Sequence, residues 1–164
     1  MKIVAFPFID VFISPLGKII IKATKDHIHQ LYFDDEFSSA ISESSLTKKA
    51  KQQLAEYFDG KRQQFELPLT QEGTAFQQQV WEQLTQVPFG ETLSYLELAL
   101  KFNDENLVRA VAGANAKNKL AIVVPCHRIV ATDGKLTGYA WGLKRKSWLL
   151  DFEAKTSGKK LSLF

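Results

Sequence analysis

The sequence of 164 residues contains a single cysteine, and this scarcity excludes a disulfide-stabilised scaffold. One thiol cannot form a disulfide within the chain, whereas small secreted domains depend on several such bonds. Residues 1–7 also lack the long apolar region and the small-residue cleavage site of a secretory signal. We therefore expect a reducing intracellular compartment: the cytoplasm, or the nucleus in a eukaryotic cell.

Long apolar runs are missing as well. No stretch approaches the roughly 20 apolar residues that a helix needs to cross a bilayer, so we expect no membrane partner. Hydrophobic residues make up 45% of the chain and charged residues 24%, which is typical of a folded globular protein and argues against disorder. The length suits one domain, or two small subdomains that share a core.

The net charge is only +3, but the positive charge is concentrated toward the C-terminus. Residues 101–164 carry more than twice as many lysines and arginines as aspartates and glutamates, whereas acidic residues predominate in residues 1–100. Such an excess suits a polyanionic partner, nucleic acid in particular. An ordinary solvated surface is the alternative that composition leaves open.

Apolar and alternating runs near the N-terminus predict a small antiparallel β-sheet. The β-rich runs 3–8 and 11–13 come first, and turns then separate them from a second run, residues 18–24, and from a third strand, residues 28–33. Apolar side chains at spacings of three and four then predict a helix over residues 46–58, which Gly60 closes. Residues 63–69 indicate either another strand or an extended linker, and Pro68 limits a strand there to a sheet edge.

The polar segment 70–74 predicts a boundary between two subdomains, residues 1–72 and residues 73–164. Helical periodicity follows it, with Thr92 or Ser94 placed to cap the second helix. The predicted helices are residues 76–84, 95–101, 105–116 and 143–152. The middle two, joined by a tight polar turn, are a helix-turn-helix candidate. The expected fold class is α+β, with a small antiparallel sheet and helix before a mostly helical subdomain that carries a helix-turn-helix DNA-binding motif.

One face of the predicted helix 105–116 is unusual. The side opposite its apolar residues carries Arg109, Gly113 and Ala116 in place of the usual long polar residues. Small side chains let a helix backbone approach a partner closely, and a single arginine projecting from them can enter a groove. Packing of this face against another part of the protein is the alternative that the pattern leaves open.

The only cysteine, Cys126, follows an apolar run and precedes His127 and Arg128. A thiol attacks as its thiolate, and neighbouring positive charge lowers the pKa that controls the thiolate fraction. His127 and Arg128 are residue types suited to that task, although neighbours in sequence need not touch in space. The alternative is a buried cysteine that acts as a small hydrophobic residue, as most free cysteines do.

The segment Pro125-Cys126-His127-Arg128 resembles the signature of the O6-alkylguanine-DNA alkyltransferases, which are also called methylated-DNA–protein-cysteine methyltransferases. The resemblance covers roughly half of the chain, in the family's order and close to its spacing. Its other matching residues are Phe76, Gly90-Glu91-Thr92, Ser94-Tyr95, Arg109-Ala110-Val111, Asn118, Gly138-Tyr139, Trp148-Leu149-Leu150 and Glu153.

The resemblance implies direct-reversal DNA repair by a single-turnover methylated-DNA–[protein]-cysteine S-methyltransferase. Such a protein flips O6-alkylguanine, and as we expect also O4-alkylthymine, out of duplex DNA and transfers the alkyl group to its cysteine, here Cys126. The product is a thioether, which has no carbonyl for water to attack, unlike the thioester of an acyl-enzyme. Each molecule is therefore expected to react once.

The resemblance also implies which groups activate the thiol. His127 matches the histidine that deprotonates the cysteine through a water molecule, and Glu153 matches the glutamate that orients it. The predicted C-terminal helix supports Glu153 separately, because it places this residue in the apolar arc between Leu149 and Leu150, where a carboxylate needs a partner. Lys146 falls on the same arc, so the arc is not wholly apolar. The alternative is that Glu153 lies at a frayed, solvent-exposed helix end.

Five further roles follow from the resemblance. Asn118 matches the asparagine that bridges the recognition helix to the active-site loop. Tyr95 matches the tyrosine whose hydroxyl reaches the flipped base and helps the departing guanine accept a proton, and Tyr139 matches the pocket wall beside the alkyl group. Arg109 matches the arginine that fills the space left in the duplex, and Thr132 aligns with a hydroxyl residue that contacts backbone phosphate.

The implied partner is double-stranded DNA, bound through the minor groove by a protein that is monomeric in solution; cooperative binding along DNA is left open. No cofactor is implied. Some relatives hold zinc in the N-terminal subdomain, but this chain has only His29 at a similar place and no cysteine there, so we expect no metal. Trp141 replaces smaller residues of some relatives, which predicts a pocket narrowed against bulky adducts.

Two other functions compete with alkyl transfer. One is a non-catalytic lesion sensor of the alkyltransferase-like type, whose members lack the cysteine that is present here. The other is a cysteine–histidine hydrolase that acts repeatedly on a small molecule and ignores DNA.

Overall fold

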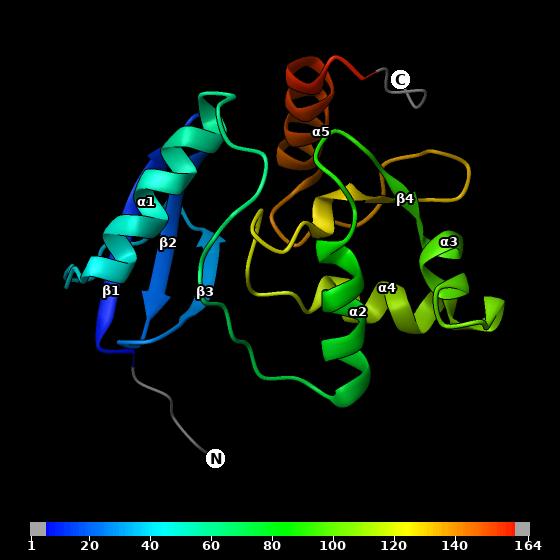
Figure 1. Ribbon diagram of the computed structural model, residues 1–164, viewed down its shortest axis with the longest axis horizontal. Helices are drawn as coiled ribbons and strands as arrows, with labels where there is room; N and C mark the ends of the chain where they lie inside the picture. The colour runs from blue at the N-terminus through cyan, green and yellow to red at the C-terminus, as the bar shows by residue number, and fades with distance from the viewer. Residues whose placement is uncertain (1–5, 160–164) are drawn as a thin grey trace. The chain divides into compact units, whose positions relative to one another are not determined.

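The computed structural model describes residues 6–159, and the chain divides into two compact units between Glu72 and Gly73. The first unit holds a three-stranded antiparallel sheet in the order β1-β2-β3 (Figure 1). Its strands are β1 Phe8–Ser14, β2 Gly17–Ala23 and β3 Ile28–Phe33. The predicted small antiparallel sheet is confirmed, with one strand where the sequence indicated two short runs; residues 3–5 lie outside the described part of the chain.

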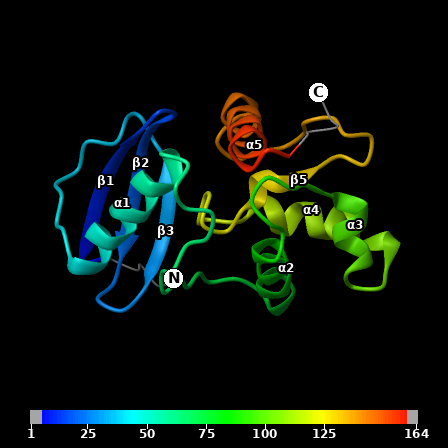
Figure 2. The same ribbon diagram turned by 45° about the horizontal axis from the view of Figure 1, so that its top comes forward.

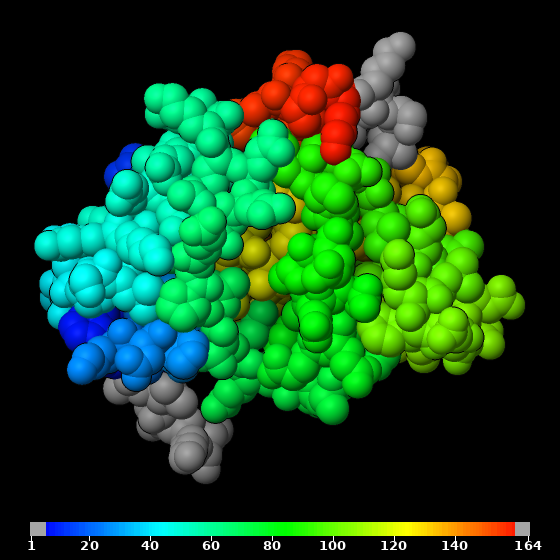
Figure 3. All heavy atoms as spheres, in the orientation of Figure 1, coloured from blue at the N-terminus to red at the C-terminus, as the bar shows by residue number. Residues whose placement is uncertain are grey.

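Helix α1, Ser45–Phe58, covers one face of this sheet (Figures 1 and 2). It begins with a capping box, in which the Ser44 side chain accepts from the N–H of Thr47 and the Thr47 side chain accepts from the N–H of Ser44. Phe58 stacks on Phe12 of β1, with ring centroids 6.1 Å apart. The other face of α1 is exposed (cyan in Figure 3), as expected for an amphipathic helix.

A buried carboxylate joins β1 to α1. Asp10 is only 1% exposed, yet each of its side-chain oxygens has a partner. Lys51 Nζ lies 3.0 Å from Oδ1, and the Thr47 hydroxyl donates to Oδ2 over 3.0 Å. A charge buried without such partners would be strongly destabilising, so these contacts fix where the helix sits on the strand.

The segment that leaves α1 is an extended linker and not a fourth strand. Only Leu69 bridges to the sheet, in parallel with Ile28, and the N–H of Ile28 donates to the Pro68 carbonyl over 2.8 Å. The Gln53 side chain both donates to the Glu66 carbonyl and accepts from its N–H. Backbone polar groups of the linker are thus paired without a continuous ladder.

The second unit is mainly helical and confirms the predicted α+β class. Its elements are α2 Ala75–Thr85, β4 Leu93–Ser94, α3 Tyr95–Leu100, the 3-10 turn η1 Glu105–Leu107, α4 Val108–Ala116, the 3-10 turn η2 Cys126–Arg128, β5 Ile129–Val130 and α5 Leu143–Ser157.

Helices α3 and α4 form the predicted helix-turn-helix. The Ser94 hydroxyl accepts a backbone N–H from the first turn of α3. Asn103, in the turn after α3, adopts a left-handed conformation with φ of 60°, and the Asp104 side chain caps η1, which leads into α4. Trp81 of α2 donates its indole N–H to the Ala114 carbonyl over 2.9 Å, which fixes α4 within the unit.

Helix α5 extends beyond its predicted end at residue 152. Its stop is Gly158, whose φ of 73° is the left-handed conformation that closes many helices. The apolar periodicity fades after Phe152, so a boundary drawn from periodicity alone falls short. Glu153 therefore lies within the helix and is 1% exposed, which excludes a frayed, wet end for it.

Gly90 turns the chain between α2 and β4 beside α5, with φ of 83°. A Cβ at this position would lie 2.3 Å from Ser157 Oγ and 3.2 Å from the Glu153 carbonyl oxygen. We expect Gly90→Ala to lower the free energy of unfolding by about 2–4 kcal/mol, because overlap adds to left-handed backbone strain. Urea denaturation followed by circular dichroism measures the loss.

Gly113→Ala is the matched control. Gly113 lies inside α4, and a Cβ there meets no atom within 4 Å. Alanine favours a helix over glycine, so this variant should gain about 0.5–1 kcal/mol. Equal changes in the two variants would contradict the steric argument for Gly90.

Candidate active site

Cys126 begins the η2 turn, which leads directly into β5. This strand pairs in parallel with β4, so that Ser94 lies opposite Val130. Because Tyr95 follows Ser94, the pairing brings the start of α3 close to the cysteine turn. Two segments more than 30 residues apart in sequence thus meet at the thiol.

Asn118 holds the loop that delivers Cys126. Its side-chain oxygen accepts from the N–H of Leu120 over 3.1 Å, and its amide donates to the carbonyls of Leu120 and Val124 over 3.2 and 2.9 Å. Ile122 in this loop has φ of 70°, which is strained for a β-branched residue. The Asn118 contacts therefore stabilise a backbone conformation that the loop would not favour alone.

The Cys126 thiol is 3% exposed. Burial raises its pKa to about 11, although a hydrogen bond from Asn118 and the charge of Lys146 oppose the rise. His127 and Arg128, which are residue types suited to lowering this pKa, both direct their side chains to Glu153. At neutral pH the thiol is protonated and needs a base before it can attack.

His127 and Glu153 form a buried pair in which Nε2 lies 2.8 Å from Oε2. Burial lowers the pKa of His127, and the nearby carboxylate only partly opposes this, so the imidazole is neutral at pH 7. A carboxylate can only accept, which assigns the ring proton to Nε2 and leaves Nδ1 as an acceptor. Nδ1 has no hydrogen-bond partner among residues 6–159. A neutral histidine in this state is a competent general base.

Arg128 holds the same carboxylate from another direction. Its Nε and a terminal nitrogen donate to the two Glu153 oxygens over 2.8 and 3.0 Å, and its other terminal nitrogen donates to the Val87 carbonyl over 2.8 Å. The N–H of Gly90 also donates to Glu153, over 3.3 Å. Burial opposes ionisation of Glu153, but His127 and Arg128 outweigh it and hold its pKa well below the usual range.

Lys146 of α5 is the second buried cation of the site, with no exposed surface. Its ammonium donates to the backbone carbonyls of Ile129, Thr137 and Gly138. Burial lowers its pKa to about 8, and the proximity of Cys126 opposes the fall. Lys146 therefore anchors the segment after the cysteine turn and places positive charge where a thiolate would form.

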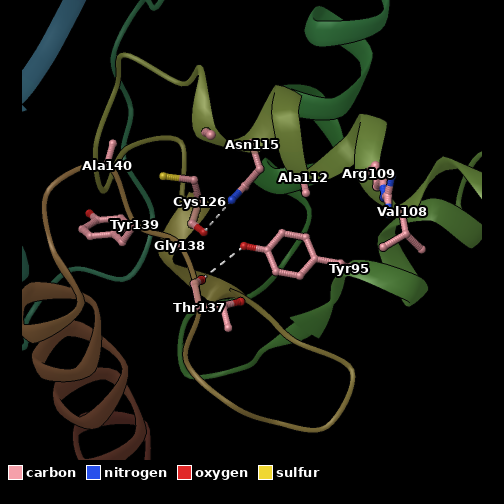
Figure 4. Close-up of a pocket in the computed structure, with 11 residues that line it drawn as sticks. Tyr95, Val108, Arg109, Ala112, Asn115, Cys126, Thr137, Gly138, Tyr139 and Ala140 are labelled. Atoms are coloured by element: carbon pink, nitrogen blue, oxygen red, sulfur yellow. Dashed lines mark hydrogen bonds between the residues drawn. The ribbon is translucent and has the colours of Figure 1, made fainter.

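A cavity of about 560 Å³ opens beside the thiol (Figure 4). Tyr95 and Asn115 lie on one side of Cys126, whereas Tyr139 and Ala140 lie on the other. Burial raises the pKa of both tyrosines, so their phenols are neutral at pH 7. The full lining is Tyr95, Val108, Arg109, Ala112, Asn115, Ala116, Cys126, Thr137, Gly138, Tyr139 and Ala140.

The structure brings most of the predicted site residues together, with two exceptions. Thr132 lies exposed in the turn after β5 and does not line the cavity. Trp141 does not line it either; its ring packs edge-on against Tyr139, with centroids 5.3 Å apart. Any influence of Trp141 on the width of the cavity must therefore act through the position of Tyr139.

Sequence reasoning missed the tasks of three residues. Arg128 was considered only as a neighbour of the thiol, and Lys146 only as an interruption of an apolar arc. That interruption was the available signal, because a lysine inside an apolar arc must find buried partners. Asn115, which lines the cavity, carried no signal in the pattern of α4.

A buried thiol, a neutral histidine held by an ionised carboxylate, and a cavity bordered by a helix-turn-helix define a class: a DNA-directed protein with a cysteine nucleophile. Comparison with known families specifies the class further. Residues 75–155 match the family described as 6-O-methylguanine DNA methyltransferase, DNA binding domain. Residues 9–71 match 6-O-methylguanine DNA methyltransferase, ribonuclease-like domain. The chain belongs to the 6-O-methylguanine DNA methyltransferase family.

The similarity to individual relatives extends over nearly their whole length. The chain is 39% identical to a methylated-DNA–protein-cysteine methyltransferase of Methanosarcina barkeri, covering 89% of this chain and 96% of the relative. It is 41% identical to the constitutive enzyme of that name from Bacillus subtilis, covering 85% and 91%. Its fold matches the crystal structure of Mycobacterium tuberculosis OGT in complex with DNA, with a TM-score of 0.82, 36% identity and coverage of 89% and 92%.

The described residues contain neither a membrane-spanning helix nor a metal-binding cluster. Within residues 6–159 no helix combines the length and apolar character needed to cross a membrane. The same part of the chain has no group of three or more histidine, cysteine, aspartate or glutamate side chains placed to hold a metal ion.

Proposed function

We propose that this protein repairs alkylated DNA by moving the alkyl group from O6 of a flipped guanine, and from O4 of a flipped thymine, to Cys126. The observation that carries the proposal is the position of the thiol. It borders a cavity of about 560 Å³ that is also lined by α4 of the helix-turn-helix, so a base turned out of a duplex bound there reaches the sulfur. Membership of the family supports the same reaction.

The geometry supports a sequence of proton transfers. His127 Nδ1 takes the thiol proton through a water molecule, and Glu153 stabilises the imidazolium that forms. The charge of Lys146 opposes the rise in pKa of Cys126 and so favours the thiolate. Sulfur then attacks the alkyl carbon, the carbon–oxygen bond breaks, and its electron pair goes to the base, which accepts a proton with help from Tyr95.

The end state follows from the bond that forms. Alkyl on sulfur is a thioether, and neither His127 nor water can release it, because no carbonyl is present for attack. The protein is therefore consumed, one molecule for each lesion. No cofactor takes part, since the guanine or thymine is itself the leaving group and Cys126 is the acceptor of the alkyl group.

The DNA is bound through the minor groove in this proposal. Arg109, Gly113 and Ala116 are all exposed on α4, so no other part of residues 6–159 covers the predicted face. Small residues allow close approach of the helix, and Arg109, at the rim of the cavity, occupies the space that the flipped nucleotide leaves. Thr132 contacts backbone phosphate from its exposed turn, and the protein acts as a monomer in the cytoplasm.

Arg109→Ala tests the task of this arginine. We expect repair of a methylated duplex to fall by about 10–100-fold, because unstacking a base costs a few kcal/mol that the inserted side chain offsets. Reaction with free O6-benzylguanine should change by less than about twofold, since that base needs no flipping. Single-turnover rates with the two substrates provide the comparison, and equal losses on both would contradict the proposed task.

The reaction itself is tested with duplex DNA that carries O6-methylguanine labelled in its methyl group. Stoichiometric label on the peptide containing Cys126, with no further turnover, supports the proposal. Tight binding without transfer of label would instead indicate a lesion sensor. Absence of both binding and label would leave the hydrolase as the remaining alternative.

A further inference from the structure

Asn115 is a polar residue of the cavity for which the proposed chemistry has no task. It lies on α4 and is 5% exposed, and its side chain extends toward Cys126 (Figure 4). The neighbouring cavity residues on the same helix are Ala112 and Ala116, which leave room beside the amide. A polar side chain buried among small residues requires hydrogen-bond partners for both ends of its amide.

Within the described residues, only the nitrogen end of the Asn115 amide is hydrogen-bonded. The amide nitrogen donates to the Cys126 carbonyl over a long 3.4 Å, and the side chain also bonds the Tyr95 phenol and so opposes the rise in its pKa. Oδ1 has no hydrogen-bond partner within the described residues. The contact with Cys126 assigns the two ends, because the reverse orientation would set two carbonyl oxygens against each other. An acceptor left unpaired at this depth is destabilising unless a ligand supplies a donor.

We propose that Asn115 Oδ1 accepts a hydrogen bond from the exocyclic amino group of the flipped guanine and thereby favours O6-alkylguanine over O4-alkylthymine. This inference rests on the proposed function. Alkylation at O6 removes the ring N–H of guanine, so its amino group is the only donor left on the pairing edge. O4-alkylthymine has lost its ring N–H in the same way and has no donor there.

The Asn115 side chain can turn to accept this hydrogen bond from the base. The terminal torsion of asparagine is broad, and a 3.4 Å hydrogen bond is a weak one. In the proposed complex the amide turns about this torsion and presents Oδ1 to the amino group of the base. A site with an acceptor placed in this way rejects a ligand without the matching donor, because the acceptor then stays unpaired.

The test compares two duplexes, one with O6-methylguanine and one with O6-methylhypoxanthine, which is the same base without the amino group. Single-turnover transfer to Cys126 is measured for the wild-type protein and for Asn115→Leu, which keeps the branched shape of the side chain but has no polar atoms. The wild type should react about tenfold faster with O6-methylguanine. In Asn115→Leu the two rates should agree within about twofold, and the relative rate on O4-methylthymine should rise.

Two further variants keep the result interpretable. Asn106→Leu makes the same chemical change on the exposed η1 turn, outside the cavity, and should preserve the wild-type ratio between the two substrates. Asn115→Ala replaces Asn115→Leu if thermal unfolding shows that the leucine variant does not fold. Only ratios of rates enter the comparison, so a general loss of activity does not decide it.

Each outcome has one meaning. A wild-type protein that transfers equally from both bases, or an Asn115→Leu variant that keeps the wild-type ratio, would overturn the assignment of Asn115 while leaving alkyl transfer intact. A wild-type protein that transfers from neither base would overturn the proposed function instead. Loss of discrimination in Asn115→Leu, with discrimination kept in Asn106→Leu, supports the assignment.

Discussion

We expect Cys126→Ala to abolish transfer of a methyl group to the protein, while its affinity for methylated duplex DNA stays within about twofold of wild type. The chain has no other cysteine that could accept the group. The helix-turn-helix surface is unaffected, since the thiol lies buried behind it. Mass spectrometry of the intact protein after incubation with methylated duplex measures transfer, and fluorescence anisotropy with labelled duplex measures binding.

Cys126→Ser is the stricter comparison, because it keeps a nucleophilic atom at the same place. An alcohol ionises far less readily than a thiol and makes a poorer nucleophile, so the single-turnover rate should fall by at least about 10⁴-fold. His127 cannot compensate, since its basicity is matched to a thiol and not to an alcohol. Methyl label recovered on the Cys126→Ala protein would place the acceptor elsewhere and remove the basis of the proposed reaction.

Local signals in the sequence were sufficient for most of the elements. Ser94 caps α3 and Gly60 follows the end of α1 with φ of 75°, both as the pattern predicts. Helical periodicity also grouped the small residues of α4 on one face, but it left open whether that face is exposed or packed. The end of α5 was wrong by several residues, since its stop at Gly158 lies beyond the last apolar contact.

The contacts that make the site could not be read in the same way. The resemblance alone paired His127 with Glu153, and no pattern in the sequence paired Arg128 with the same carboxylate. Both side chains bind Glu153, which lies 26 and 25 residues farther along the chain. Periodicity places Glu153 on a buried face of its helix, but it does not say which loop that face meets.

The burial of the site explains why it needs so many charged groups. A thiol kept from water has a raised pKa, and the base beside it is neutral for the same reason. Proton transfer from Cys126 to His127 creates two opposite charges, so each must be stabilised where it forms. In the proposed reaction, the carboxylate of Glu153 stabilises the imidazolium, and the positive charge of Lys146 stabilises the thiolate. Glu153 in turn depends on Arg128 to remain ionised.

Glu153→Gln should therefore weaken both the fold and the reaction. The variant leaves the Arg128 guanidinium buried without its carboxylate, which should lower the free energy of unfolding by about 3–5 kcal/mol at pH 7. Methyl transfer should fall by at least about tenfold, because glutamine stabilises an imidazolium poorly. Asp151→Asn on the same helix is the control. Its ion pair with Lys155 is exposed, so its loss should change stability by less than about 1 kcal/mol.

The pH dependence of the stability difference between wild type and Glu153→Gln distinguishes the effect of the Glu153 charge from the effect of its packing. His127 has a pKa lowered from 6.5, and Glu153 has a pKa held well below 4.5. Below each ordinary value the unfolded chain binds a proton that the folded protein does not, so wild-type stability falls with acidification, first below pH 6.5 and more steeply below 4.5. Glu153→Gln lacks the second contribution. Its deficit relative to wild type should therefore shrink as the pH falls through 4.5, as urea titrations between pH 7 and pH 3 would reveal. A deficit of constant size would mean that Glu153 acts through packing alone, and the charge-based account of the site would have to be abandoned.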